Sequence, residues 1–259
     1  MTIEYKGTPI FFTDTGNGNT VVLLHGFLEN SSMWNPFINQ LSKKNRVVCI
    51  DLLGHGKTGC LGYLHSMELM AEVVEAVLKH LKIRRSILIG HSMGGYVALA
   101  FAQKKPNAVK GLCLMNSTAS ADTEEKKLNR DRGIIAVKQN HNTFIRIAIS
   151  NLFRPKNRAL YSDAILHVIK EAQKTSLQGI IAALEGMKIR KNREALLQNS
   201  AYKKMMIISK KDPALNYDSL INQTKNTHVK VVEFPDGHMS HIENKNDLLK
   251  EIMHFIENI

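Results

Sequence analysis

The chain alternates between short continuous runs of apolar residues and longer segments in which apolar residues recur every three or four positions. The runs have the length of buried strands and stand at 21–24, 47–50, 87–89 and 111–115. The segments between them show the spacing of one buried helix face, at 33–41, 66–81 and 96–102. Strands that alternate with helices in this way predict a parallel sheet with helices on both faces.

The two ends of the chain continue this pattern. A turn between Tyr5 and the run 10–13 predicts an opening hairpin. Toward the carboxyl end, the runs 205–209 and 229–234 predict two further strands, and apolar positions from 248 to 256 predict a closing helix. We therefore expect an α/β fold with a mostly parallel sheet of about eight strands flanked by helices.

The alternation of strands and helices stops between residues 118 and 201. No buried strand is evident there, and helical periodicity is found at 124–139, 142–152, 163–175 and 177–186. We interpret residues 118–201 as a helical cap inserted before the last two strands. Residues 1–117 and 202–259 would then form the core.

Composition and charge add little to this picture. The chain has 259 residues, of which 44% are hydrophobic and 22% charged, as in ordinary globular proteins. Its net charge is +12, and the segment 118–200 alone holds fifteen Lys or Arg against eight Asp or Glu. Because the basic residues are scattered and no nucleic-acid-binding motif accompanies them, we expect a solvated basic surface rather than a nucleic-acid partner.

The location of the protein is predicted from its first residues and its cysteines. The N-terminal residues lack the pattern of a signal peptide, and no apolar run is long enough to span a membrane. The three cysteines show no metal-ligand spacing; Cys49 and Cys113 lie in strand-like runs as small core residues, and Cys60 lies in a glycine-rich loop. We expect a cytoplasmic protein with no membrane span.

One turn carries a chemical pattern. Directly after the run 87–89 stands Gly90-His91-Ser92-Met93-Gly94, and a helical segment follows. Glycines on both sides of Ser92 permit a turn too tight for a Cβ atom, which is how a nucleophilic serine is held at the top of a sheet. Alone, this pattern arises by chance in about one chain of this length in ten. Whether the pattern marks Ser92 as a nucleophile therefore depends on the residues in the other loops.

Those loops gather at the same edge of the predicted sheet, because the carboxyl ends of parallel strands lie together. His25-Gly26-Phe27 follows one strand, and Asp51 to Gly56 follows the next. Asp212 and His238 follow the last two strands. A serine hydroxyl needs a neighbouring base, usually a histidine, which is itself oriented by a carboxylate. Ser92, Asp212 and His238 supply these groups.

The order Ser92, Asp212, His238, together with the stretches around 25–27, 51–56 and 237–243, resembles the α/β-hydrolase superfamily in its branch of capped serine esterases. The resemblance implies that Ser92 is the nucleophile, His238 the general base and then acid, and Asp212 the orienting carboxylate.

The same resemblance assigns the oxyanion hole to the backbone N–H groups of Phe27 and Met93. It implies no cofactor and no metal.

Neighbouring residues offer rival assignments. His241 is a second candidate base, although in the resembling pattern the histidine directly after glycine is catalytic and the later one helps to hold the loop. Some relatives place the acid where this chain has Asn116, which carries no charge. A metal site at His238-x-x-His241 lacks further ligands at a suitable spacing. Three other polar residues at the edge are expected to hold loops: His25, Asp51 and His55.

A serine at the elbow narrows the reaction. Related dehalogenases and epoxide hydrolases carry aspartate there, so Ser92 favours acyl transfer followed by hydrolysis. We expect a carboxylesterase that acts on a small-molecule ester. The open alternatives are an ester carried by an acidic acyl carrier protein that the basic cap recruits, carbon–carbon bond hydrolysis, cofactor-free peroxidase activity and, in a different class, a ligand receptor with slow turnover.

Overall fold

A computed structural model describes residues 1–259 of the protein. Its strands form one eight-stranded sheet. The strands are β1 (Thr2–Tyr5), β2 (Thr8–Thr15), β3 (Asn19–Leu24), β4 (Asn45–Ile50), β5 (Ser86–His91), β6 (Val109–Met115), β7 (Lys203–Ser209) and β8 (Val229–Phe234). Their order is β1-β2-β4-β3-β5-β6-β7-β8. The pairs β1–β2 and β2–β4 are antiparallel, and all other pairs are parallel. The expected mostly parallel sheet of about eight strands is confirmed.

Eleven helices accompany the sheet: α1 (Asn35–Leu41), α2 (Met67–His80), α3 (Met93–Lys104), α4 (Glu124–Gln139), α5 (His141–Ser150), α6 (Ser162–Ala172), α7 (Leu177–Lys188), α8 (Ala195–Asn199), α9 (Tyr217–Thr224), α10 (Ser240–Glu243) and α11 (Lys245–Glu257). Three short 3-10 helices join them: η1 (Ser31–Trp34), η2 (Pro106–Ala108) and η3 (Pro155–Asn157). Three long helices begin after a side chain that accepts a backbone N–H: Ser66, Thr123 and Ser176. No helix is both long and apolar enough to cross a bilayer.

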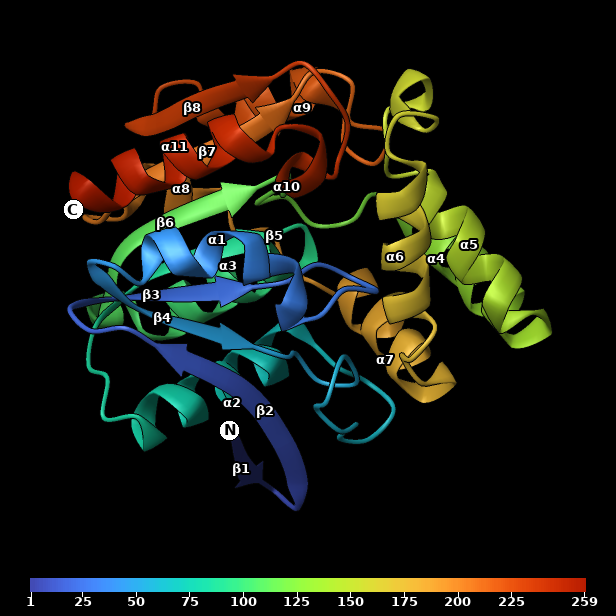
Figure 1. The fold of residues 1–259 in the computed structure, drawn as a ribbon, viewed down its shortest axis with the longest axis horizontal. Coiled ribbons are helices and arrows are strands. Elements are labelled where there is room, and N and C mark those ends of the chain that lie inside the picture. The colour runs from blue at the N-terminus through green and yellow to red at the C-terminus, as the bar shows by residue number, and fades with distance from the viewer.

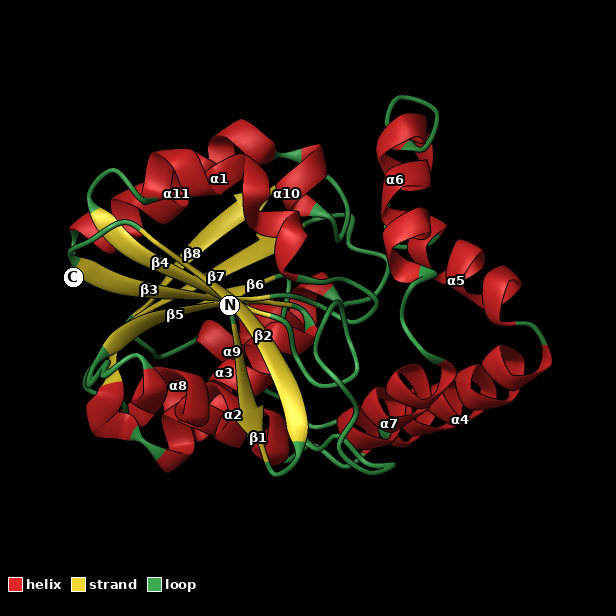
Figure 2. Ribbon diagram, turned by 60° about the horizontal axis from the view of Figure 1, so that its bottom comes forward, coloured by secondary structure: helices red, strands yellow, loops and turns green.

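Helices cover both faces of the sheet (Figure 2). Alternate strand residues explain this arrangement, because Val21 and Leu23 of β3 pack in the cluster that contains α1 and α11. Val22 and Leu24 pack in the opposite cluster, with α2 and α3. A strand buried on both faces must be apolar at every position, which is why the sequence shows continuous runs rather than alternation.

Helices α4 to α8 all lie between β6 and β7 in sequence. Figure 1 shows α4, α5, α6 and α7 beyond the end of the sheet toward which the arrows of β3 and β6 point. Helix α7 is fixed to the core, because the His65 N–H donates to the Ala182 carbonyl at 2.9 Å. A Cβ on Gly186 would stand 1.8 Å from the His65 carbonyl oxygen, so only glycine permits this approach.

The sequence pattern does not predict α8 and α9. Both are short, and each buries only one or two side chains, such as Leu197 in α8 and Leu220 in α9. One or two buried residues, of which only one is hydrophobic in each helix, define no period, so hydrophobic spacing cannot reveal such helices.

Candidate active site

Ser92 stands in a strained turn between β5 and α3. Its backbone angles are φ 49° and ψ −115°, a conformation that residues with a Cβ rarely adopt. A Cβ on Gly90 would lie 2.4 Å from the backbone of Gly94, and one on Gly94 would lie 2.4 Å from the Leu24 carbonyl oxygen. Glycine at both positions is therefore what permits the turn and the close packing of α3 on β3.

Ser92, His238 and Asp212 form a continuous chain of hydrogen bonds. The Oγ of Ser92 lies 2.8 Å from Nε2 of His238, and Nδ1 of His238 lies 2.7 Å from Oδ2 of Asp212. The side chains of His238 and Asp212 are 3% and 0% exposed. Because a carboxylate only accepts, Nδ1 carries the hydrogen and Nε2 is free to accept the serine proton. The structure thus places all three residues in contact.

Asp212 is held by four donors. Besides His238, its Oδ1 accepts the N–H groups of Ala214 at 2.8 Å and Leu215 at 3.1 Å, and its Oδ2 accepts the Asn116 amide at 3.2 Å. Burial alone would raise the pKa of Asp212, but the charge of His238 and these hydrogen bonds lower it below its usual value. The carboxylate therefore stays ionised.

Asn116 has a role that the sequence did not reveal. Its Nδ2 also donates to the Ser209 hydroxyl at 2.8 Å, and its Oδ1 accepts from the Ser240 hydroxyl at 2.6 Å. The side chain thereby joins the ends of β6 and β7 to α10, next to Asp212. The sequence did contain one signal of this role: Asn116 is a polar residue directly after a buried strand, at the same edge of the sheet as Asp212.

The two backbone N–H groups expected in the oxyanion hole are free of partners. Met93 is the first residue of α3, where an N–H has no acceptor within the helix. The N–H of Phe27 donates to no acceptor in the protein. Gly26 lies directly against the elbow, since a Cβ there would be 3.2 Å from the Cβ of Ser92. Both donors therefore lie on segments that adjoin the hydroxyl.

His25, Asp51 and His55 hold loops at this edge. Nε2 of His25 accepts the Leu52 N–H at 2.8 Å, and Nδ1 of His55 lies 3.0 Å from the Leu53 carbonyl. Burial lowers the pKa of His55 to about 3. Asp51 accepts two backbone N–H groups, those of Ser31 and Lys57. None of the three is hydrogen-bonded to Ser92 or His238.

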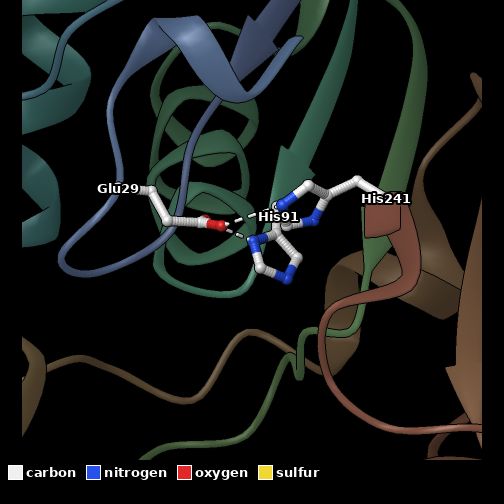
Figure 3. Close-up of side chains that lie close together, drawn as sticks. All are labelled: Glu29, His91 and His241. Atoms are coloured by element: carbon white, nitrogen blue, oxygen red, sulfur yellow. Dashed lines mark hydrogen bonds and ion pairs between the residues drawn. The ribbon is translucent and has the colours of Figure 1, made fainter. Parts of the chain in front are cut away.

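A buried cluster of Glu29, His91 and His241 adjoins the hydrogen-bond chain (Figure 3). Oε2 of Glu29 accepts the Gly26 N–H at 2.8 Å and lies 2.6 Å from Nδ1 of His91. Nε2 of His91 lies 3.1 Å from the His238 carbonyl oxygen. Glu29 and His91 thus connect the Gly26 loop, the elbow and the His238 loop, a link that sequence analysis missed.

His91 carries a proton on both ring nitrogens, because one faces a carboxylate of Glu29 and the other a carbonyl, and both groups only accept. Burial opposes the charge, but the Glu29 carboxylate and the hydrogen bonds outweigh it and raise the His91 pKa. His241 differs, since burial lowers its pKa to about 4 and its Nε2 lies 3.4 Å from Glu29. His238, not His241, contacts Ser92.

The ligand atoms of Glu29, His91 and His241 all lie within 4.8 Å of one another, and these residue types can bind a transition metal. Two ligands at about 2.1 Å from one tetrahedral ion lie about 3.4 Å apart. The 2.6 Å between Glu29 and His91 is too short for an ion to bridge and suits a hydrogen bond. The cluster fits an ion pair better than a metal centre.

Ser92 and His238 face a cavity of about 710 Å³. Phe27 and Tyr96 line it from the core. Residues of α4, α5 and α7 and the loop before α9 line the other sides, with both apolar and charged side chains. A cavity of this size can hold a drug-sized molecule.

Comparisons with known proteins agree with the fold. A family model described as alpha/beta hydrolase fold matches residues 19–245. A thermophilic esterase from Thermogutta terrifontis, solved with malate bound, is 27% identical with a TM-score of 0.89, covering 99% of this chain and 96% of that one. The enol-lactonase from Burkholderia xenovorans, at 20% identity and a TM-score of 0.90 over 99% of this chain and 100% of that one, is similar in fold.

Curated relatives match a shorter region. An uncharacterised protein of Mycobacterium tuberculosis is 35% identical over 106 residues, which is 41% of this chain and 31% of that protein. The chain therefore spans about a third of the length of the first curated relatives that it matches.

Proposed function

The chain belongs to the alpha/beta hydrolase family, and on this premise we propose that it is a serine hydrolase that cleaves a carboxylic ester. The observation that carries the proposal is the chain of hydrogen bonds from Ser92 through His238 to Asp212, which faces the large cavity. The similarity to an esterase at 27% identity supports the choice of an ester as substrate.

In the first half of the reaction, Oγ of Ser92 bonds to the ester carbonyl carbon while Nε2 of His238 takes its proton. The carbonyl oxygen becomes an oxyanion, which the N–H groups of Phe27 and Met93 stabilise by about 3 to 4 kcal/mol each. The carbon–oxygen bond to the alcohol then breaks, and His238 gives the proton to the leaving oxygen. An acyl group remains on Ser92.

In the second half, His238 takes a proton from water as the water oxygen bonds to the acyl carbon. The bond between the acyl carbon and Oγ of Ser92 then breaks, His238 returns the proton to Oγ, and the carboxylic acid leaves. Asp212 orients the imidazole throughout and stabilises its charged form, which is why its four donors matter.

We further propose that residues 118–201 act as a cap that determines which esters enter. This segment supplies the part of the cavity's lining that comes from α4, α5 and α7. It therefore determines the shape of the acyl or alcohol group that the cavity accepts. Its contact with the core through α7 keeps one wall fixed.

The test is hydrolysis of 4-nitrophenyl esters of increasing acyl length by the wild type, Ser92→Ala and the control Ser162→Ala, whose serine is exposed on α6. We expect the control to match the wild type and Ser92→Ala to lose at least about 10³-fold in kcat. Equal rates in the wild type and Ser92→Ala would refute the proposal.

A further inference from the structure

We propose that the ester carries a second, anionic group, a carboxylate, which Lys126 binds in the cavity. The inference rests on the proposed function, because it concerns the same substrate at the same site. Lys126 lies in the first turns of α4, is half-buried and lines the cavity with Ser92 and His238.

Lys126 forms no ion pair in the protein, and two carboxylates on the same helix are paired with other lysines. Glu124 pairs with Lys127 at 2.7 Å, and Asp131 pairs with Lys188 at 2.6 Å. Glu125 also lines the cavity but is exposed to solvent. An ammonium group that is partly removed from water and left unpaired is costly, so it favours a ligand that brings the missing charge.

The wall beside Lys126 has an excess of cations. The buried carboxylate of Asp122 pairs with both Arg130 and Arg190, so one negative charge serves two guanidinium groups. Nη2 of Arg190 is buried without a partner, and its guanidinium lies 4.2 Å from the ring centre of Tyr96, which lines the cavity. Lys126, Arg130 and Arg190 therefore stand against one buried carboxylate, Asp122, and the exposed carboxylate of Glu125.

The ionisation of Lys126 agrees with this environment. Burial lowers its pKa, and the charges of Arg190 and Arg130 lower it further, against the opposing effect of Asp122 and Asp212. A carboxylate bound beside Lys126 would reverse this balance. A neutral ester would leave the ammonium group unpaired. The site therefore distinguishes an anionic ester from a neutral one by charge.

The experiment compares esters of matched length with and without a carboxylate. On the acyl side, the mono-4-nitrophenyl esters of succinic, glutaric and adipic acid are compared with 4-nitrophenyl butyrate, pentanoate and hexanoate. On the alcohol side, 4-carboxyphenyl acetate is compared with phenyl acetate. The series varies the spacing between the carboxylate and the ester bond and tests both parts of the ester.

The measured quantity is the ratio of kcat/KM for the anionic ester to kcat/KM for its neutral counterpart. We expect a wild-type ratio above one in at least one series, and Lys126→Met should lower it by about 10- to 100-fold, the usual effect of one charge-assisted hydrogen bond. Lys126→Arg should keep part of the preference. The control Lys127→Met removes the neighbouring lysine that is paired with Glu124 and should keep the wild-type ratio.

A wild-type ratio at or below one in both series, or an equal ratio in the wild type and Lys126→Met, would overturn the inference. Such a result differs from a failure of the proposed function, which would show as neutral-ester hydrolysis that is absent or independent of Ser92. A preference that Lys127→Met removes equally would also overturn the inference, because it would indicate general attraction by the basic surface.

Discussion

Replacement of Glu29 by Gln tests the buried pair that connects the three loops of the site. Glu29→Gln preserves size but removes the charge opposite His91, where the two side chains are 3% and 1% exposed. Breaking one side of a buried ion pair costs about 3 to 5 kcal/mol. If His91 then releases its proton, the cost falls to that of one weakened buried hydrogen bond, about 1 to 3 kcal/mol. We expect a loss of about 2 to 4 kcal/mol in the free energy of unfolding.

The pH dependence of this loss follows from the two pKa shifts. The raised pKa of His91 means that its contribution is complete below the ordinary value of 6.5 and is lost as the pH rises through the folded value. Burial opposes ionisation of Glu29, but His91 lowers its pKa overall, so its contribution is complete above 4.5 and is lost as the pH falls. The effect of Glu29→Gln should be largest between pH 4.5 and 6.5 and smaller in alkali.

Urea unfolding followed by fluorescence measures this effect, because the single tryptophan, Trp34, is fully buried in the core. The control Glu72→Gln removes a surface carboxylate, 35% exposed and paired with Lys104, and should change stability by less than about 0.5 kcal/mol. A loss in Glu29→Gln no larger than that of the control at pH 5.5, or one that grows toward alkaline pH, would refute the assignment of a charged pair.

Three further predictions concern the site and the core. Asp212→Asn should lower kcat on 4-nitrophenyl esters by about 10⁴-fold, because the imidazole loses its charged partner and its correct tautomer; an effect below tenfold would contradict the role of Asp212. Asn116→Ala should lower kcat/KM by about tenfold, since Asp212 loses one donor, and unchanged kinetics would show that the bond at 3.2 Å is unimportant. Of the three thiols, only Cys60 should react quickly with a disulfide reagent in the native protein, because Cys49 and Cys113 are buried and burial raises the pKa of Cys49 to about 12; rapid labelling of all three would contradict this.

The sequence predicted the sheet because strands buried on both faces must be apolar throughout, as in β3 and β5. It also predicted that Ser92, Asp212 and His238 lie at one edge, because each follows a parallel strand. It did not predict the Glu29–His91 pair, since these residues are 62 positions apart and the pattern around Ser92 that contains His91 does not show which residue His91 contacts. Partners of this kind are set by tertiary packing.

The same limit applies to Lys126. In the sequence it is one of many basic residues between 118 and 200, and it stands next to Lys127. Only the structure separates the two, because Lys127 pairs with Glu124 while Lys126 lines the cavity. The helical period can place a residue on a face of α4, but it does not show what that face contacts.

The proposed function requires that Ser92 is the nucleophile of a hydrolase. The most direct measurement is mass spectrometry of peptides after the wild type has reacted with a fluorophosphonate, which forms a bond to an activated serine oxygen. We predict a single adduct on Ser92, absent in Ser92→Ala and greatly slowed in His238→Ala. An adduct on another residue, or no adduct on the folded protein, would contradict this role of Ser92.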